Sequence, residues 1–276
     1  MKKVYISADI EGIWGNANPA YTVKSGREYE EYRTNMIEEV NLFIRLLLDN
    51  GVEEIVVNDG HGNMDNLLAS RLDKHASLVV SNGAYKAYGM MEGLDDSFDA
   101  VCFIGYHCRS NTSGVMSHTV WGTMVRKIEV DGKEMGESGI NARLAWEYGV
   151  PVTLISGDHE LKQQLEEELQ KPFAFVETKK AVSSQCAICC SWEELERRYE
   201  KAIHSMKKLA YPCDDYPATN HKMDITFHHA RNAEFVSRMD GVELIDSCTV
   251  RIQKNTYKEL YAYMRFVIKI CNAFAM

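Results

Sequence analysis

Three short apolar segments of this chain each end in a side chain that can bind a metal ion. Residues 3–8 are followed by Asp9 and Glu11, residues 54–58 lead to His61, and residues 100–106 lead to His107. Each run has the length and composition of a buried strand. The carboxyl ends of parallel strands meet at one edge of an open α/β sheet, and ligands bind at that edge. The pattern therefore predicts an α/β fold with a metal site at the rim of its sheet.

The composition narrows the class of protein. The chain has 276 residues, of which 45% are hydrophobic and 26% charged, with a net charge of −9. Such a chain is typical of a soluble globular protein with one large domain or two modest ones. We expect no nucleic-acid partner, because phosphate binding needs a basic face. We also expect no signal peptide or membrane span, because Asp9 and Glu11 interrupt the first apolar run. A cytoplasmic location follows as the expectation.

Strand and helix patterns alternate along the first half of the chain. Ser25, with Glu28 three residues later, predicts a capping box and the start of a helix that ends near Gly51. Further strands are predicted over residues 125–130, 152–155, 223–228 and 248–252, and further helices over residues 136–149 and 158–170 and from Ser191 and Thr256. The pattern predicts a layered α/β/α body with a mixed sheet and a smaller C-terminal α+β lobe. We place the metal-site domain at residues 1–180 and the lobe at residues 181–276, either separate or integral to the same domain and involved in assembly.

Each candidate ligand also has an ordinary structural explanation. Asp9 and Glu11 can splay toward one ion from just beyond a strand end, or they can cap a loop and face water. His61 lies between two glycines, which allow a close approach to a ligand, but turn histidines are also common. His107 is either a rim ligand or a satisfied core histidine. Glu137 starts a helix, where the helix dipole alone favours a glutamate.

Taken together, these five residues suggest a metal centre. Mixed carboxylate and imidazole ligands suit zinc or a similar hydrolytic metal. Five ligands exceed the need of one tetrahedral ion with an open position, and they match two ions that share a bridging carboxylate and activate a water molecule. His118, on a polar loop after His107, suits an acid–base or oxyanion-stabilising role.

Cys186, Cys189 and Cys190 form a C-x-x-C-C cluster. A structural zinc site needs a further ligand pair at a recognisable spacing, and none follows. We expect these thiols, like the other cysteines, to be free in a reducing cytoplasm.

Six motifs together carry a resemblance to a known family. They are Ser7–Gly12, Val57–His61, Met91–Asp96, Gly105–His107, Gly114–His118 and Gly136–Ala142. In these motifs, which cover most of residues 1 to about 160, the chain resembles the DppA-type D-aminopeptidases, a family of zinc-dependent metallopeptidases. The loop between His118 and Glu137 is one residue longer than the family pattern, which leaves substrate preference and assembly open.

The resemblance implies a role for each site residue. Asp9 would bridge two zinc ions; Glu11 and His61 would complete one shell, and His107 and Glu137 the other. His118 would be the catalytic histidine. The family further implies a cytoplasmic, ring-like homodecamer that removes N-terminal D-residues, typically D-alanine, from short peptides.

Two other functions remain open at this stage. The same site could act as a two-metal hydrolase on a non-peptide amide or a phosphoester. A non-catalytic protein that binds peptides or stores metal in an assembly would bind peptides tightly without hydrolysing them.

Overall fold

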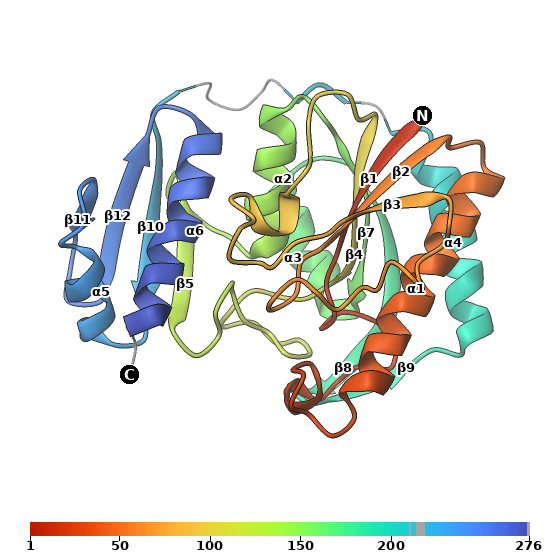
Figure 1. The fold of residues 1–276 in the computed structure, drawn as a ribbon, viewed down its shortest axis with the longest axis horizontal. Helices are drawn as coiled ribbons and strands as arrows, with labels where there is room; N and C mark the ends of the chain where they lie inside the picture. The colour runs from red at the N-terminus through yellow and green to blue at the C-terminus, as the bar shows by residue number, and fades with distance from the viewer. Residues whose placement is uncertain (210, 214–218, 275–276) are drawn as a thin grey trace.

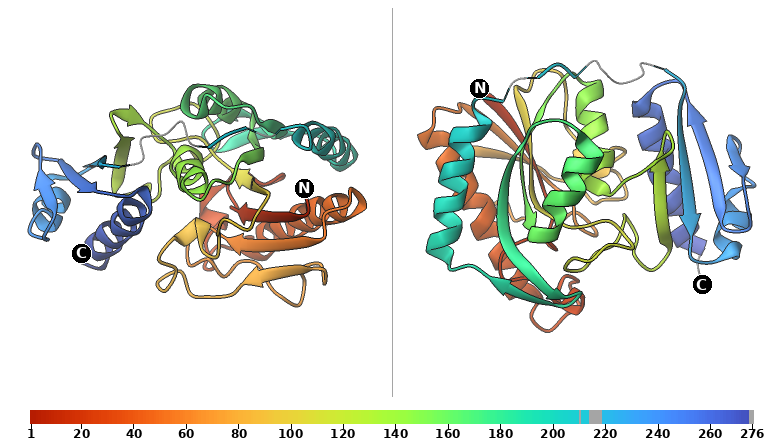
Figure 2. Two further views of the ribbon diagram at one scale, coloured as in Figure 1. Left: turned by 90° about the horizontal axis from the view of Figure 1, so that it is seen from above. Right: turned by 180° about the vertical axis from the view of Figure 1, so that it is seen from behind.

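The computed structural model describes residues 1–209, 211–213 and 219–274. The strands of the first sheet are β1 (Lys3–Ala8), β2 (Glu54–Asp59), β3 (Ala76–Val79), β4 (Ala100–Tyr106), β7 (Val152–Asp158), β8 (Ala174–Ser183) and β9 (Cys186–Cys189). Those of the second are β5 (Val125–Val130), β6 (Lys133–Glu134), β10 (His221–Phe227), β11 (Val242–Leu244) and β12 (Thr249–Lys254). The two sheets lie at opposite ends of the long axis (Figures 1 and 2).

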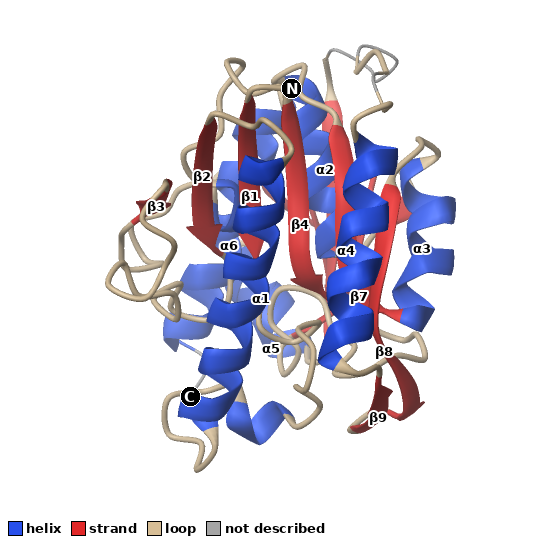
Figure 3. Ribbon diagram, turned by 90° about the vertical axis from the view of Figure 1, so that its right-hand side faces the viewer, coloured by secondary structure: helices blue, strands red, loops and turns tan. Residues whose placement is uncertain are grey.

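The first sheet is mixed, as predicted. Its order is β3-β2-β1-β4-β7-β8-β9, with parallel pairing throughout except for the antiparallel edge strand β9. Helices α1 (Tyr29–Asp49) and α4 (Trp192–Met206) cover one face, and α2 (Glu137–Glu147) and α3 (His159–Leu169) cover the other (Figure 3). Alternate residues of β1 serve the two cores, because Ile6 packs with the first helix pair and Tyr5 with the second. The layered α/β/α prediction is confirmed.

The second sheet is antiparallel, in the order β11-β12-β10-β5-β6. Two helices pack on it, α5 (Ala230–Val236) and α6 (Tyr257–Phe274), and α6 also contacts α2 (Figure 1). Strands β5 and β6 reach this sheet from the N-terminal half of the chain, while α4, beyond residue 180, packs on the first sheet. The domain boundary at residue 180 stays a prediction.

The predicted start of the first helix is wrong. The α1 helix begins at Tyr29, because residues 25–28 form turns in which the Gly26 N–H donates to the carbonyl of Val23 at 2.8 Å. The Glu28 carboxylate binds Arg27 instead of closing a capping box. The helix starts predicted at Ser191 and Thr256 are confirmed. Ser191 caps α4 by accepting a hydrogen bond from the Glu194 N–H, and Thr256 and Glu259 form a reciprocal capping box at the start of α6.

Two further expectations concern the cysteines and the membrane. No disulfide bond forms among the described residues, and Cys102 and Cys271 are buried. Cys186, Cys189 and Cys190 lie on or beside β9 and belong to neither of the metal-competent clusters found in the described residues. No helix in the described part of the chain combines the length and the apolar character needed to cross a bilayer.

Candidate metal centre

Close backbone contacts bring the segment with Asp9 and Glu11, after β1, next to the segment with His107, after β4. The Gly12 N–H donates to the carbonyl of Gly105 at 2.7 Å, so the loop after β1 lies against the end of β4. A Cβ atom at Gly12 would stand 1.9 Å from the carbonyl oxygen of Tyr106, and one at Gly105, whose φ is +73°, would stand 2.3 Å from that of Asp9. Only glycine permits this approach. It places the Asp9 loop directly beside His107.

The third ligand segment follows β2. The Asp59 carboxylate accepts hydrogen bonds from the N–H groups of His61, at 3.2 Å, and Leu67, at 2.8 Å. Asp59 thus orders the loop rather than the imidazole ring. The ring itself is oriented by Thr22, whose carbonyl accepts from Nε2 of His61 at 3.0 Å. Nδ1 is therefore the nitrogen of His61 that is available for a ligand.

Asp9, Glu11 and His61 form one potential ligand group, whose donor atoms lie within 4.8 Å of one another. Nδ1 of His61 is 3.3 Å from Oδ1 of Asp9 and 2.7 Å from Oε2 of Glu11. Both carboxylates are buried. Two buried carboxylates in one such group are costly unless a proton or a cation neutralises part of their charge.

His107, His118 and Glu137 form the second group, by the same 4.8 Å criterion. Glu137 is the first residue of α2, and its Oε1 lies 3.4 Å from Nε2 of His107 and 3.8 Å from Nε2 of His118. The two imidazoles stack with their centroids 4.1 Å apart. All six predicted residues therefore meet in one cluster, and the geometry puts His118 within reach of a metal as well as of substrate.

Asp9 joins the two groups. Its Oδ1 faces His61, and its Oδ2 lies 3.4 Å from Nε2 of His107. A carboxylate with one oxygen toward each group has the geometry of a ligand that bridges two ions.

The burial and the hydrogen bonds of the cluster fit the binding of two zinc ions. Nε2 of His107 is buried and makes no hydrogen bond among the described residues, which is costly unless another partner binds it. Each histidine uses its other nitrogen to donate to a backbone carbonyl, at 2.9 Å to Cys108 for His107 and at 2.8 Å to Met116 for His118. Metal-ligating histidines are held in this way.

The ionisation of the cluster reflects its burial and its crowded charges. Burial raises the pKa of Asp9 well above its ordinary value, and the Glu11 carboxylate raises it further. Burial acts in the same direction on Glu11, but the adjacent His61 holds the pKa of Glu11 well below its ordinary value. Against the effect of burial, the Glu137 carboxylate raises the pKa of His107 to about 10. Metal binding requires neutral imidazoles, so uptake of a cation by this cluster releases protons.

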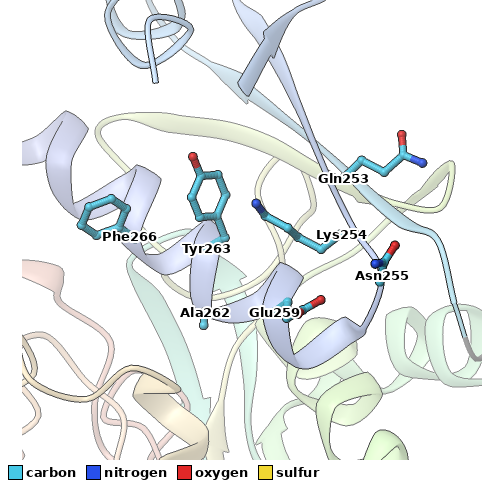
Figure 4. Close-up of a pocket in the computed structure, with 7 residues that line it drawn as sticks. All are labelled: Gln253, Lys254, Asn255, Glu259, Ala262, Tyr263 and Phe266. Atoms are coloured by element: carbon cyan, nitrogen blue, oxygen red, sulfur yellow. The ribbon is translucent and has the colours of Figure 1, made fainter. Parts of the chain in front are cut away.

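A cavity of about 920 Å³ opens beside the cluster, and Asp9, Glu11, His61, His118 and Glu137 all line it. Its volume is that of a typical small-ligand site. A second hollow, on the outer face of α6, is lined instead by residues such as Tyr263, Phe266 and Lys254 (Figure 4). None of its lining residues belongs to a metal-competent group of the described chain.

The remaining histidines lie outside the centre. None of His75, His159, His204, His221, His228 and His229 belongs to either ligand group of the described residues.

Lys179 supports the site and had no sequence signal. Its buried ammonium group donates to the carbonyls of Glu11 at 2.6 Å and Ile13 at 2.8 Å, and also to that of Asn16. The three carbonyls are more than 160 residues away in the sequence, in the loop after β1, and no local pattern places that loop beside β8. Lys179 thereby fixes the backbone that carries Glu11.

Replacing Lys179 with methionine should lower the free energy of unfolding by about 2–4 kcal/mol, because three buried carbonyls lose their donor. Denaturant unfolding of the metal-free protein measures this change. Lys180→Met is the matched control, since Lys180 is the exposed neighbour on the same strand. Equal stability of the two variants would contradict the assigned role.

Glu168 on α3 predicts a pH dependence of stability. Its Oε1 accepts from the N–H of Gly136 and from Arg109, both at 3.0 Å, and burial raises its pKa from 4.5 to about 7. A carboxyl whose pKa is higher in the folded state stabilises the fold below its unfolded pKa and loses that contribution as pH rises. Relative to Glu168→Gln, the wild type should lose on the order of 3 kcal/mol between pH 4.5 and 7, since one pKa unit is worth ~1.4 kcal/mol. Unfolding measured across this range tests the slope, with Glu167→Gln, at an exposed position of the same helix, as the control.

Comparisons with known proteins agree with this geometry. The D-aminopeptidase family model matches residues 1–266. A D-aminopeptidase of Bacillus subtilis (strain 168) is 33% identical over 265 residues, which cover 95% of each chain. The solved structure of the Zn-dependent D-aminopeptidase DppA from Bacillus subtilis, described as a self-compartmentalizing protease, superposes with a TM-score of 0.91 at 31% identity over 99% of both chains. The chain therefore belongs to the D-aminopeptidase family.

Proposed function

We propose that this chain is a zinc-dependent aminopeptidase that removes the N-terminal residue, a D-amino acid such as D-alanine, from short peptides. Family membership supports the metallopeptidase activity. The observation that carries the two-metal assignment is the Asp9 carboxylate, with one oxygen toward each ligand group.

In this proposal Glu11 and His61 hold one ion, His107 and Glu137 hold the other, and Asp9 is shared. Zinc bound in such a pair lowers the pKa of a water molecule and polarises a substrate carbonyl. The ligand residues stay fixed because each imidazole is anchored by a backbone carbonyl.

His118 supplies proton transfer in the proposed reaction. Its Nδ1 donates to the carbonyl of Met116, which leaves Nε2 directed at the acidic cluster. At this position Nε2 can receive a proton and return it to the leaving amine, or stabilise the oxyanion as the imidazolium.

Hydrolysis of D-Ala-D-Ala, L-Ala-L-Ala, p-nitrophenyl phosphate and a non-peptide amide by zinc-loaded protein tests the function. We expect cleavage of the D-dipeptide to exceed that of the other three substrates. Faster cleavage of the phosphoester or the non-peptide amide would favour the alternative hydrolase. Tight binding of both dipeptides without cleavage of any substrate would favour a binding protein.

The assembly and location are parts of the same proposal. A relative is described as a self-compartmentalizing protease, which supports an oligomer of this chain. The ring-like decamer is the finer proposal, which the family resemblance implies. Light scattering should then give ten times the 31.4 kDa mass of the chain, and a monomer would contradict the ring. Eight free cysteines support a reducing, cytoplasmic location.

A further inference from the structure

The cavity beside the metal centre is lined by both acidic and basic side chains. The ligand carboxylates line one side, and Arg265 and Lys269 of α6 line another. Lys24 also lines the cavity, but Asp65 neutralises it in an ion pair. Arg265 and Lys269 have no carboxylate of the described chain within ion-pair distance. The cavity therefore presents two cationic groups that form no ion pair with the described residues.

The Arg265 side chain packs closely against the protein and keeps unused hydrogen-bond donors. Its guanidinium lies against Gly89, where a Cβ atom would stand 2.3 Å from Cζ, so the absence of a side chain there makes room for it. Its Nε is buried and has no hydrogen-bond partner among the described residues. Lys269 is anchored beside it by donating to the carbonyl of Gly83. A planar guanidinium with unused donors matches a carboxylate, which it can bind through two parallel hydrogen bonds.

Helices α2 and α6 bring Arg265 and the metal centre to the same cavity. Asn141 lies one turn after Glu137 on α2, and its Oδ1 accepts from the Tyr261 hydroxyl of α6 at 2.6 Å. Arg265 lies one turn after Tyr261 on α6, and all four residues line the cavity. The cavity, at about 920 Å³, has the volume of a small-ligand site and can hold a short peptide.

We propose that Arg265 and Lys269 bind the C-terminal carboxylate of a short peptide whose N-terminal residue lies at the metal centre. This inference rests on the proposed function and narrows its substrate class. Peptides of two or three residues with a free C-terminus reach both ends of the cavity. A C-terminal amide loses the charged contacts, and a longer chain carries its carboxylate past them.

Binding of an uncleavable ligand tests the inference separately from turnover. The probe is D-Ala-D-Ala with a methylene-amine group in place of its amide bond, prepared as the free acid and as the C-terminal amide, and titrated calorimetrically into zinc-loaded protein. The wild type should bind the acid about 10- to 100-fold more tightly, as expected for hydrogen bonds between charged groups. Arg265→Met should remove most of this preference and Lys269→Met part of it. Lys24→Met, which alters a paired lysine of the same cavity, should keep it.

Each variant is measured with both ligands, so any loss of folded protein cancels in the ratio. A wild-type ratio near one, no binding of either ligand, or an unchanged ratio in both Arg265→Met and Lys269→Met would overturn the inference. Preferential binding of the acid without hydrolysis of D-Ala-D-Ala would keep the carboxylate site and refute the proposed function. Hydrolysis of D-Ala-D-Ala without any preference for the acid over the amide ligand would refute the carboxylate site and keep the proposed function.

Discussion

The His118→Ala variant should retain its zinc and lose about 10²- to 10⁴-fold in kcat, the usual contribution of a positioned acid–base group. The reason is that His118 directs Nε2 toward the cavity, 3.9 Å from Oε1 of Glu11, while its other nitrogen is fixed by a backbone carbonyl. The measurements are the zinc content of the purified variant and its steady-state turnover of D-Ala-D-Ala.

The zinc content decides between the two roles that the geometry allows His118. Zinc loss in proportion to activity would make it a ligand of the second ion and leave proton transfer to another group. The matched control is His75→Ala, which removes an exposed histidine paired with Asp73 and should alter neither quantity.

The Asp9→Ala variant should lose most of both zinc ions together with the activity. We expect the zinc content to fall from about two ions per chain to fewer than about one, because the same carboxylate faces both ligand groups. Elemental analysis after dialysis against zinc-free buffer measures the content, and circular dichroism verifies that the variant is folded.

A variant of a residue proposed to bind only one ion is the matched comparison for Asp9→Ala. His61→Ala should keep about one zinc per chain, since His61 contacts only the first group. Asp65→Ala, an exposed acidic residue on the same cavity, should keep both. If Asp9→Ala still binds two ions, Asp9 is not the bridging ligand.

The part of the fold that holds the site could be predicted because its signals are local. Strands β1, β2 and β4 are apolar runs that end abruptly in polar residues, and the topology of open α/β sheets then sets where those ends meet. Strand β8 carries Glu177, Lys179 and Lys180 in its middle and shows no comparable apolar run, and the two-residue strand β6 has too few residues to show a pattern. The start of α1 differs from the prediction because the capping box at Ser25 competes with a local turn, in which the Gly26 N–H donates to the carbonyl of Val23.

That the six candidate residues lie close together could likewise be predicted, whereas the contacts that support them could not. Asp9, His61 and His107 follow strand ends, but the contacts of Lys179 cross more than 160 residues. Arg265 and Lys269 look in the sequence like ordinary basic residues of an amphipathic helix. Only the packing of α6 against α2 turns them toward the cavity.

The position of β1 between β2 and β4 has a consequence for the lifetime of the folded chain. The proposed ligands Asp9, His61 and His107 follow β1, β2 and β4, which pair in the sheet but are connected along the chain by long crossovers. A bound metal pair would therefore hold the ends of these three strands together. A ligand that binds only the folded state stabilises it by about 4 kcal/mol when its free concentration is 1,000 times its dissociation constant. Loss of zinc would then lower the stability of the folded chain as well as its activity, and unfolding and proteolysis would become faster.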